Sequence, residues 1–149
     1  MYRLSLAILG DEADARDAAQ ETLVNAWRQL RGLRDPGRFD AWLQRIVVNA
    51  ARQAIRSNRR RRAREIPSSS VVELAGRAAP RERGDAAVLD AALATLPVDQ
   101  RSLLVLHHLE RRGLVELAEI LDIPVGTAKS RLFAARRALA AAITLENGR

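Results

Sequence analysis

The chain of 149 residues contains no cysteine and a single lysine, Lys129, and only 3% of its residues are aromatic. Without cysteine there is no disulfide framework and no thiolate metal site, and a cytoplasmic protein is the simplest interpretation. So few aromatic rings predict small cores lined by alanine and leucine between helices, with no aromatic-lined ligand cavity. No apolar run is long enough to cross a membrane, and no signal peptide or lipidation signal is visible, so we expect no membrane insertion.

The patterns that mark enzymes are also missing. We find no Gly-rich phosphate loop, no nucleophile paired with a base and no convergent pair of carboxylates. The two histidines, His107 and His108, are adjacent, so on a helix they point about 100° apart and cannot bind one metal together. We therefore expect a non-enzymatic protein with no catalytic residue, no cofactor and no metal site.

Positive charge is what the chain has in excess. Its 25 basic and 18 acidic residues give a net charge of +7, which favours a polyanionic partner, either nucleic acid or an acidic membrane surface. Eight arginines and no acidic residue lie between residues 45 and 64. Neutralising phosphates with them would release counterions and make the affinity for DNA depend on salt. A disordered, solubilising arginine run is the alternative, but part of this run follows an amphipathic helical pattern.

The clearest pattern lies between Leu114 and Ala140. Leucine and alanine recur there at helical spacing, Asp122-Ile123-Pro124 interrupts the pattern, and a second, arginine-rich helical pattern follows. The inward stripe of this second helix consists of Ala128, Leu132, Ala135, Leu139 and Ala142. Its opposite face carries Thr127, Lys129, Ser130, Phe133, Arg136 and Arg137.

The composition of that opposite face suits a helix that reads the major groove of DNA. Cationic side chains can bind phosphates. Hydroxyl groups and cationic side chains can also bind base edges, and an apolar side chain can contact thymine methyls. The pattern therefore predicts a helix-turn-helix. Two alternatives stay open: a helical hairpin with a merely solvated basic face, and a core position for Phe133.

Three helical segments are predicted before the arginine run ends. Residues 2–9 form a short apolar helix that ends at Gly10, and Asp11 fits the N-cap of a second helix that reaches about Leu33. The inward stripe expected for the second helix is Ala15, Ala19, Leu23, Ala26, Leu30 and Leu33. Its other face is polar, which is usually only a solvated surface but could also bind a protein; it carries Asp17, Gln20, Glu21, Asn25 and Arg28.

A turn at Asp35-Pro36-Gly37 separates the second helix from a third, which begins near Phe39. Residues 65–85 then have the proline, glycine and serine content of a flexible linker. Beyond the linker, helical patterns run through residues 86–96 and from Pro97 toward Gly113, a residue that fits a C-terminal cap. We predict an all-α protein of two small helical domains joined by this linker, the second containing the helix-turn-helix.

Four segments, in this order, resemble the extracytoplasmic-function sigma factors of the sigma-70 family, which are specificity subunits of bacterial RNA polymerase. They read DARDAAQETLVNAWRQL, RFDAWLQRIVVNAARQAIR, LATLPVDQRSLLVLHHLE and LAEILDIPVGTAKSRLFAARRAL. The resemblance implies a sigma region 2-like domain at 1–64, a linker at 65–85 and a sigma region 4-like domain at 86–149. It also implies three partners: core RNA polymerase, promoter DNA and an anti-sigma factor. Because the family's first helix normally starts earlier, we expect a shortened N-terminal helix.

The resemblance further implies roles for individual residues. Polymerase binding would involve Asp17, Gln20, Glu21 and Trp27. The non-template strand of the minus-ten element would be held by Arg45, Arg52 and Arg56, while Asn49 reads a base flipped into a pocket beside this segment. In the minus-thirty-five element, Lys129, Ser130, Phe133 and Arg136 would lie nearest the bases, with Thr127, Arg131 and Arg137 on phosphates.

Two other functions remain possible from the sequence. A stand-alone helix-turn-helix regulator would bind duplex DNA without polymerase, but it would need a dimer seam or ligand pocket, and neither is visible. A non-specific basic binder of DNA or RNA would explain the charge but not the patterned second domain. We therefore expect a promoter-specificity factor.

Overall fold

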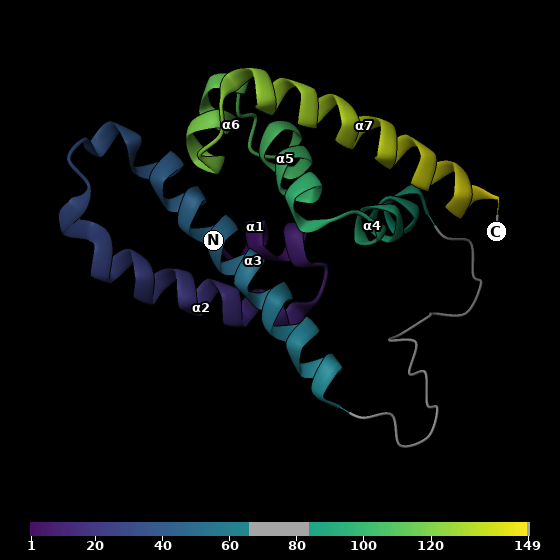
Figure 1. The fold of residues 1–149 in the computed structure, drawn as a ribbon, viewed down its shortest axis with the longest axis horizontal. Coiled ribbons are helices and arrows are strands. Elements are labelled where there is room, and N and C mark those ends of the chain that lie inside the picture. The colour runs from purple at the N-terminus through teal and green to yellow at the C-terminus, as the bar shows by residue number, and fades with distance from the viewer. Residues whose placement is uncertain (66–83, 149) are drawn as a thin grey trace.

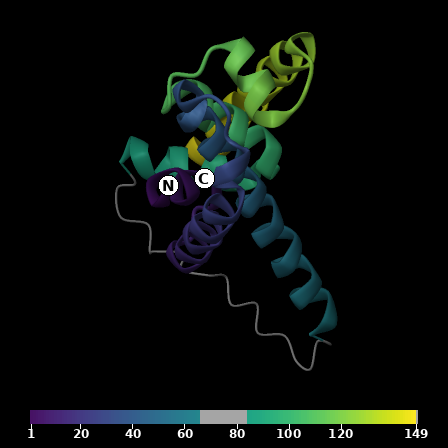
Figure 2. The same ribbon diagram turned by 90° about the vertical axis from the view of Figure 1, so that its left-hand side faces the viewer.

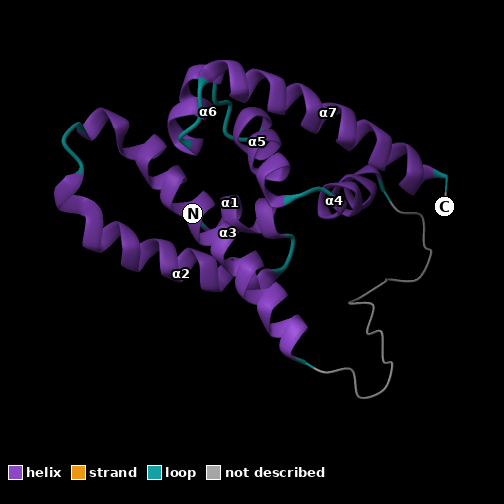
Figure 3. Ribbon diagram, viewed as in Figure 1, coloured by secondary structure: helices purple, strands orange, loops and turns teal. Residues whose placement is uncertain are grey.

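The computed structural model describes residues 1–65 and 84–148, and within these ranges it contains helices and no strand (Figures 1 and 3). The α-helices are α1 (Tyr2–Leu9), α2 (Glu12–Gln29), α3 (Phe39–Arg64), α4 (Asp85–Thr95), α5 (Val98–His108), α6 (Leu114–Leu121) and α7 (Val125–Asn147). Two 3-10 turns, η1 (Leu30–Gly32) and η2 (Pro36–Arg38), connect α2 to α3. The all-α prediction is confirmed, while most of the predicted linker, residues 65–85, lies outside the described residues.

The first three helices pack together, with α1 and α3 both lying against α2. Gly10 adopts a left-handed conformation (φ 72°), which lets the chain reverse after α1. The side chain of Asp11 then caps α2 by accepting a hydrogen bond of 2.8 Å from the Asp14 N–H. The predicted N-cap is therefore confirmed.

The inward face predicted for α2 is partly wrong. Ala15, Ala18 and Thr22 are buried, whereas Leu23 and Leu30 of the expected stripe are exposed. The buried hydroxyl of Thr22 donates to the carbonyl oxygen of Ala18 at 2.7 Å. Because this hydrogen bond satisfies the hydroxyl, a polar residue can face the close contact between helices while the larger leucines remain outside.

The last four helices form a second group, in which α7 packs across α4, α5 and α6. The expectation that Gly113 caps the end of α5 is wrong, because α5 ends at His108 and Gly113 lies at the start of α6. The left-handed position before α6 is occupied instead by Arg111 (φ 54°). Gly113 is the N-cap residue of α6, and its N–H donates to the Glu116 carboxylate at 2.9 Å.

The two groups of helices share one apolar core. Ile8 of α1 and Val47 of α3 belong to the same buried cluster as Leu103 of α5 and Leu117 of α6. Arg101 of α5 reinforces this packing, because its guanidinium donates to the carbonyl oxygen of Ile8 at 2.8 Å. By contrast, the last turns of α3 project beyond the other helices (Figure 2), and the arginines at positions 59–62 and 64 are exposed.

Candidate nucleic-acid interface

A tight corner joins α6 to α7. Asp122 ends α6 in the left-handed conformation (φ 54°, ψ 52°), which aspartate tolerates better than most residues. The Ile123 N–H donates to the carbonyl oxygen of Ala118 at 3.0 Å, and Pro124 occupies the N-cap of α7. Two helices therefore meet at a short turn, as the sequence pattern predicted.

The inward and outward faces of α7 also agree with the sequence. Its buried side chains include Ala128, Leu132 and Ala135, and these pack against α5 and α6. On the outer face, Lys129, Ser130, Arg131, Phe133, Arg136 and Arg137 are exposed, and Thr127 is half-buried. Phe133 is 63% exposed, so the structure does not give it the core position that remained possible from the sequence.

A shallow hollow lies beside this outer face. Lys129, Ser130, Phe133 and Arg136 line it from α7, and His107 contributes from α5. Nearby, desolvation and then the positive charges of His107 and Arg136 lower the pKa of His108 below its ordinary value. The lowered pKa favours the neutral form of His108, so this side chain adds little positive charge to the surface near neutral pH.

The face of α3 assigned to the non-template strand lies next to the second group of helices. The guanidinium of Arg52 contacts the Asn49 side-chain oxygen at 3.4 Å, so the structure brings these two residues together. Arg45 lies one turn earlier and is half-buried. Arg56 lies farther along α3, where it lines a groove with Gln53, Ser57 and Arg60.

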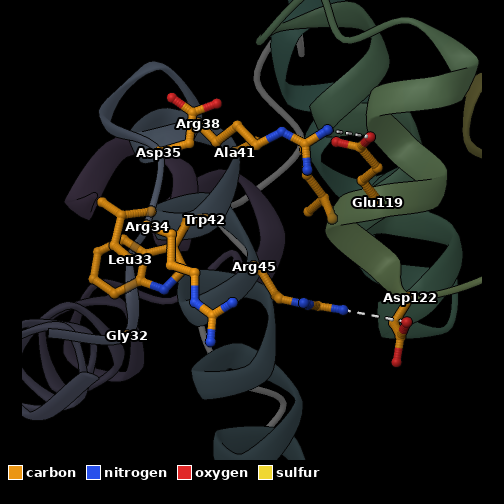
Figure 4. A pocket seen from close by; sticks show the side chains of 11 residues that line it. Gly32, Leu33, Arg34, Asp35, Arg38, Ala41, Trp42, Arg45, Glu119 and Asp122 are labelled. Atoms are coloured by element: carbon orange, nitrogen blue, oxygen red, sulfur yellow. Dashed lines mark hydrogen bonds and ion pairs between the residues drawn. The ribbon is translucent and has the colours of Figure 1, made fainter. Parts of the chain in front are cut away.

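Three ion pairs that sequence reasoning missed join this region to α5 and α6. Arg52 Nε lies 2.7 Å from Asp99 Oδ1, and Arg45 Nη2 lies 3.3 Å from Asp122 Oδ1. The third pair joins Arg38 Nη2 to Glu119 Oε1 at 3.1 Å. Figure 4 shows the last two pairs side by side. No local spacing in the sequence indicates them, because their partners are far apart along the chain.

A hollow of about 480 Å³ opens where these two ion pairs lie (Figure 4). Arg34, Arg38, Trp42 and Arg45 line it from the α2–α3 connection and α3, and α6 closes the opposite side. Trp42 is half-buried and packs against Phe39 with ring centroids 5.6 Å apart. Asn49 is not among the lining residues. Sequence reasoning did not single out Arg34 or Arg38, whose only signal was their position beside the Asp35-Pro36-Gly37 turn.

The outer face of α2 is more apolar than the sequence suggested. Trp27 is 81% exposed, and Leu23, Val24 and Leu30 are exposed at neighbouring helical positions. The polar residues Asp17, Gln20 and Glu21 lie on the exposed part of the same helix. A contiguous exposed apolar patch with a polar border is typical of a protein-binding surface.

Two family models match the chain: Sigma-70 region 2 over residues 1–61 and Sigma-70, region 4 over residues 86–139. The RNA polymerase sigma-H factor of Pseudomonas aeruginosa is 31% identical, and the match covers 91% of this chain and 76% of that protein. The ECF RNA polymerase sigma-E factor of Salmonella typhimurium is 33% identical over 85% of this chain and 72% of that protein. This chain belongs to the extracytoplasmic-function sigma factors of the sigma-70 family.

The similarity extends to a solved structure of a sigma factor. RpoE from Bartonella quintana, in complex with the anti-sigma factor NepR, matches with a TM-score of 0.68 and 26% identity. The match covers 96% of this chain and 89% of that one. As a sigma factor, this chain binds core RNA polymerase and directs promoter-specific initiation of transcription. The prediction of a promoter-specificity factor is therefore confirmed. No helix in the described ranges combines the length and hydropathy needed to span a bilayer.

Proposed function

We propose that the outer face of α7 reads the minus-thirty-five element in the major groove. Lys129, Ser130, Phe133 and Arg136 would lie nearest the bases, while Thr127, Arg131 and Arg137 bind phosphates. The observation that carries this proposal is the division of α7 into a buried alanine and leucine face and an exposed face rich in cations and hydroxyls. The N-terminus of α7 follows the corner directly and adds a favourable field for a phosphate.

The strand-binding surface lies on α3 and bears Arg45, Asn49, Arg52 and Arg56. The three arginines bind phosphates of the non-template strand, and Asn49 reads an unstacked base through its donor and acceptor groups. The hollow lined by Trp42 and Arg45 supports strand binding by α3, because an aromatic side chain and cations suit a base beside a phosphate, but it does not bear on base reading by Asn49, which does not line it. Unstacking costs a few kcal/mol, which strand and polymerase contacts together must offset.

The exposed face of α2 is our proposed surface for polymerase. Trp27, with its large exposed ring, would insert into the partner, while Asp17, Gln20 and Glu21 form the polar border. An anti-sigma factor would be a further partner, as in the RpoE structure. We place the protein in the cytoplasm and assign it two domains, 1–64 and 86–149, joined by the linker 65–85. Catalysis of transcription belongs to the polymerase.

The test of the duplex-reading surface is transcription by core polymerase and this protein on a pool of promoter fragments at fixed salt. Promoter-dependent transcripts establish the sequence preference. Replacing Lys129 and Ser130 together by alanine should then reduce transcription from the preferred promoter far more than transcription from the others. Each lost base contact should lower the discrimination between promoters by about 1–3 kcal/mol. The matched control is Arg137→Ala, which removes a proposed phosphate contact and should reduce transcription from all promoters about equally. If the Lys129 and Ser130 changes also reduce transcription from all promoters equally, these two residues do not read bases.

Base reading by Asn49 has a separate test. With 2-aminopurine at the minus-ten position of the non-template strand, open-complex formation gives a fluorescence increase as that base unstacks. Asn49→Ala should reduce this signal, and Arg52→Ala should weaken strand binding whatever the base. If Asn49→Ala leaves open-complex formation unchanged while Arg52→Ala reduces binding, the role proposed for Asn49 is wrong.

A further inference from the structure

The outer face of α2 carries opposite charges on the two sides of Val24. Asp17 and Glu21 precede Val24, while Arg28 lies in the last turn of α2 and Arg31 in the 3-10 turn η1 that follows. All four charged side chains are exposed. Among the described residues, Asp17, Arg28 and Arg31 have no ion-pair partner. These charges are therefore available to another molecule.

The order of these charges is symmetric in position about Val24 and opposite in sign. Asp17 and Arg31 each lie seven residues from Val24, while Glu21 lies three residues before it and Arg28 four residues after it. Seven residues are about two helical turns, or roughly 10 Å along the helix axis. The helix dipole does not account for the two acidic residues, because its effect falls off beyond the first turn.

We propose that α2 pairs with the same helix of a second copy of this chain, in an antiparallel arrangement with Val24 near the two-fold axis. Asp17 then lies opposite the partner's Arg31, and Glu21 lies opposite the partner's Arg28. We call this arrangement the α2 pair. Because it covers Trp27, the free protein exchanges between a monomer that can bind polymerase and a dimer that cannot. That last consequence alone rests on the polymerase-binding role proposed above.

The apolar side chains of the face suit the same arrangement. Leu23 and Trp27 are separated by one helical turn and lie along one edge of the face, whereas Glu21 and Arg28 lie along the other edge. A two-fold axis between antiparallel helices places each edge beside the same edge of the partner. Apolar side chains therefore meet apolar side chains, and charges meet opposite charges. Each buried tryptophan removes about 150–250 Å² from water.

A second copy can reach this face without any helix moving. α2 lies at the edge of the protein, with α1 and α3 packed against its inner side (Figure 1). The net charge of +7 on each copy favours repulsion, but charges farther apart than about 8 Å are largely screened at physiological salt. One helix from each copy buries less than the roughly 1,600 Å² of a standard interface, so we expect a dissociation constant on the order of 10 µM.

The experiment is sedimentation velocity of the full chain at about 1 to 300 µM and one fixed ionic strength. The sedimentation coefficient of the wild type should rise with concentration. Asp17→Arg and Arg31→Asp each place like charges opposite one another at two symmetric positions, so each should raise the dissociation constant about tenfold or more. The double variant restores both pairs with their signs exchanged and should return the constant to within about threefold of the wild type.

Rescue by the double variant identifies a contact between chains. Asp17 and Arg31 are about 20 Å apart along the helix axis, so they cannot pair within one chain. Asp90→Arg, on the exposed surface of α4, makes the same change of charge as Asp17→Arg and should alter the dissociation constant less than about twofold. A chain that stays monomeric over the whole range, or a double variant no better than the single variants, would overturn the proposal.

Cross-linking tests the position of the two-fold axis. The chain has no cysteine, so Val24→Cys and Ala13→Cys each introduce a single thiol on the exposed face of α2. In the α2 pair the two copies of position 24 face each other across packed helices, about 8–10 Å between axes, while the two copies of position 13 are about 30 Å apart. A bismaleimide that spans about 10 Å should therefore join Val24→Cys chains at least about fivefold faster. Equal rates would show random collision and contradict the α2 pair.

Adding core polymerase separates self-association from the polymerase-binding role. Polymerase should suppress the cross-linking of Val24→Cys, because both partners need the same face of α2. If cross-linking persists while polymerase is bound, the α2 pair stands and the polymerase-binding role proposed for this face is wrong. If Trp27→Ala weakens polymerase binding in a chain that never dimerises, the face serves polymerase alone and the α2 pair is wrong.

Discussion

Arg101 should contribute more to stability than any exposed arginine, because it connects the two groups of helices. It is half-buried, and burial lowers its pKa from the ordinary value, although a guanidinium remains charged at neutral pH. Its Nε donates to the Leu96 carbonyl oxygen at 3.0 Å, and its Nη1 donates to the Ile8 carbonyl oxygen at 2.8 Å. Ile8 lies in the last turn of α1, where the helix itself offers its carbonyl no partner.

The change Arg101→Met keeps the apolar stem and removes both hydrogen bonds. A hydrogen bond from a charged group contributes about 1.5–3 kcal/mol, and the two bonds are not additive because one half-exposed group makes both. We therefore expect the free energy of unfolding to fall by about 2–4 kcal/mol. Urea unfolding followed by far-ultraviolet circular dichroism measures this difference.

The control for this prediction is Arg16→Met. Arg16 pairs with Glu12 at 3.6 Å, and both side chains are more than 60% exposed, so its loss should cost less than about 0.5 kcal/mol. Loss of Arg101 should also broaden the unfolding transition, because the first three helices and the last four would unfold less cooperatively. If Arg101→Met and Arg16→Met have equal effects, the hydrogen bond from Arg101 to Ile8 does not hold the two groups of helices together.

Three further changes test other parts of the structure. Trp27→Ala should change the free energy of unfolding by less than about 0.5 kcal/mol, because the ring is exposed. It should nevertheless weaken association with core polymerase about tenfold or more in a fluorescence anisotropy titration. Unchanged association would exclude Trp27 from the polymerase-binding surface. Ala18→Leu should cost about 1–3 kcal/mol by overfilling the buried face of α2, as thermal unfolding would measure, and a neutral result would show that this face can expand. Glu116→Ala should lower the free energy of unfolding by about 1 kcal/mol at pH 7, because it removes the cap at the start of α6. The hydrogen bond from the Gly113 N–H, and then the one from Arg112, lower the pKa of Glu116 below its ordinary value of 4.5. That contribution is complete above the ordinary value and is lost as the pH falls through the lower folded-state value, so urea unfolding at several pH values should show the difference from wild type shrinking in acid.

The elements with strong periodicity could be predicted from the sequence. In α7, alanine and leucine recur every three or four residues opposite a run of cations, so only one face of the helix could be buried. The corner before it was equally clear, because Asp122 and Pro124 both interrupt a helix. The same reasoning failed for α2, where a buried threonine satisfies its own hydroxyl and the exposed leucines break the expected pattern.

The contacts of the candidate strand-binding site could be predicted only in part. Arginines on α3 were visible as a run of charge, and their position on an amphipathic helix was predictable. Their pairing with Asp99 and Asp122 depends on how two groups of helices pack, and an isolated acidic residue carries no signal of a distant partner. The hollow lined by Arg34 and Trp42 was hidden for the same reason, because residues from several elements form it together.

The single lysine of the chain gives this sigma factor a built-in chemical reporter. Lys129 is exposed on the outer face of α7, and its ε-amine is the one primary amine that any side chain of this protein offers. A reagent that acylates amines therefore modifies the α-amino group and this position alone. Mass spectrometry of the modified peptide can follow how accessible Lys129 is in the free protein, with polymerase and on promoter DNA. The α-amino group serves as the internal standard, so occupancy of the groove can be measured without introducing any label.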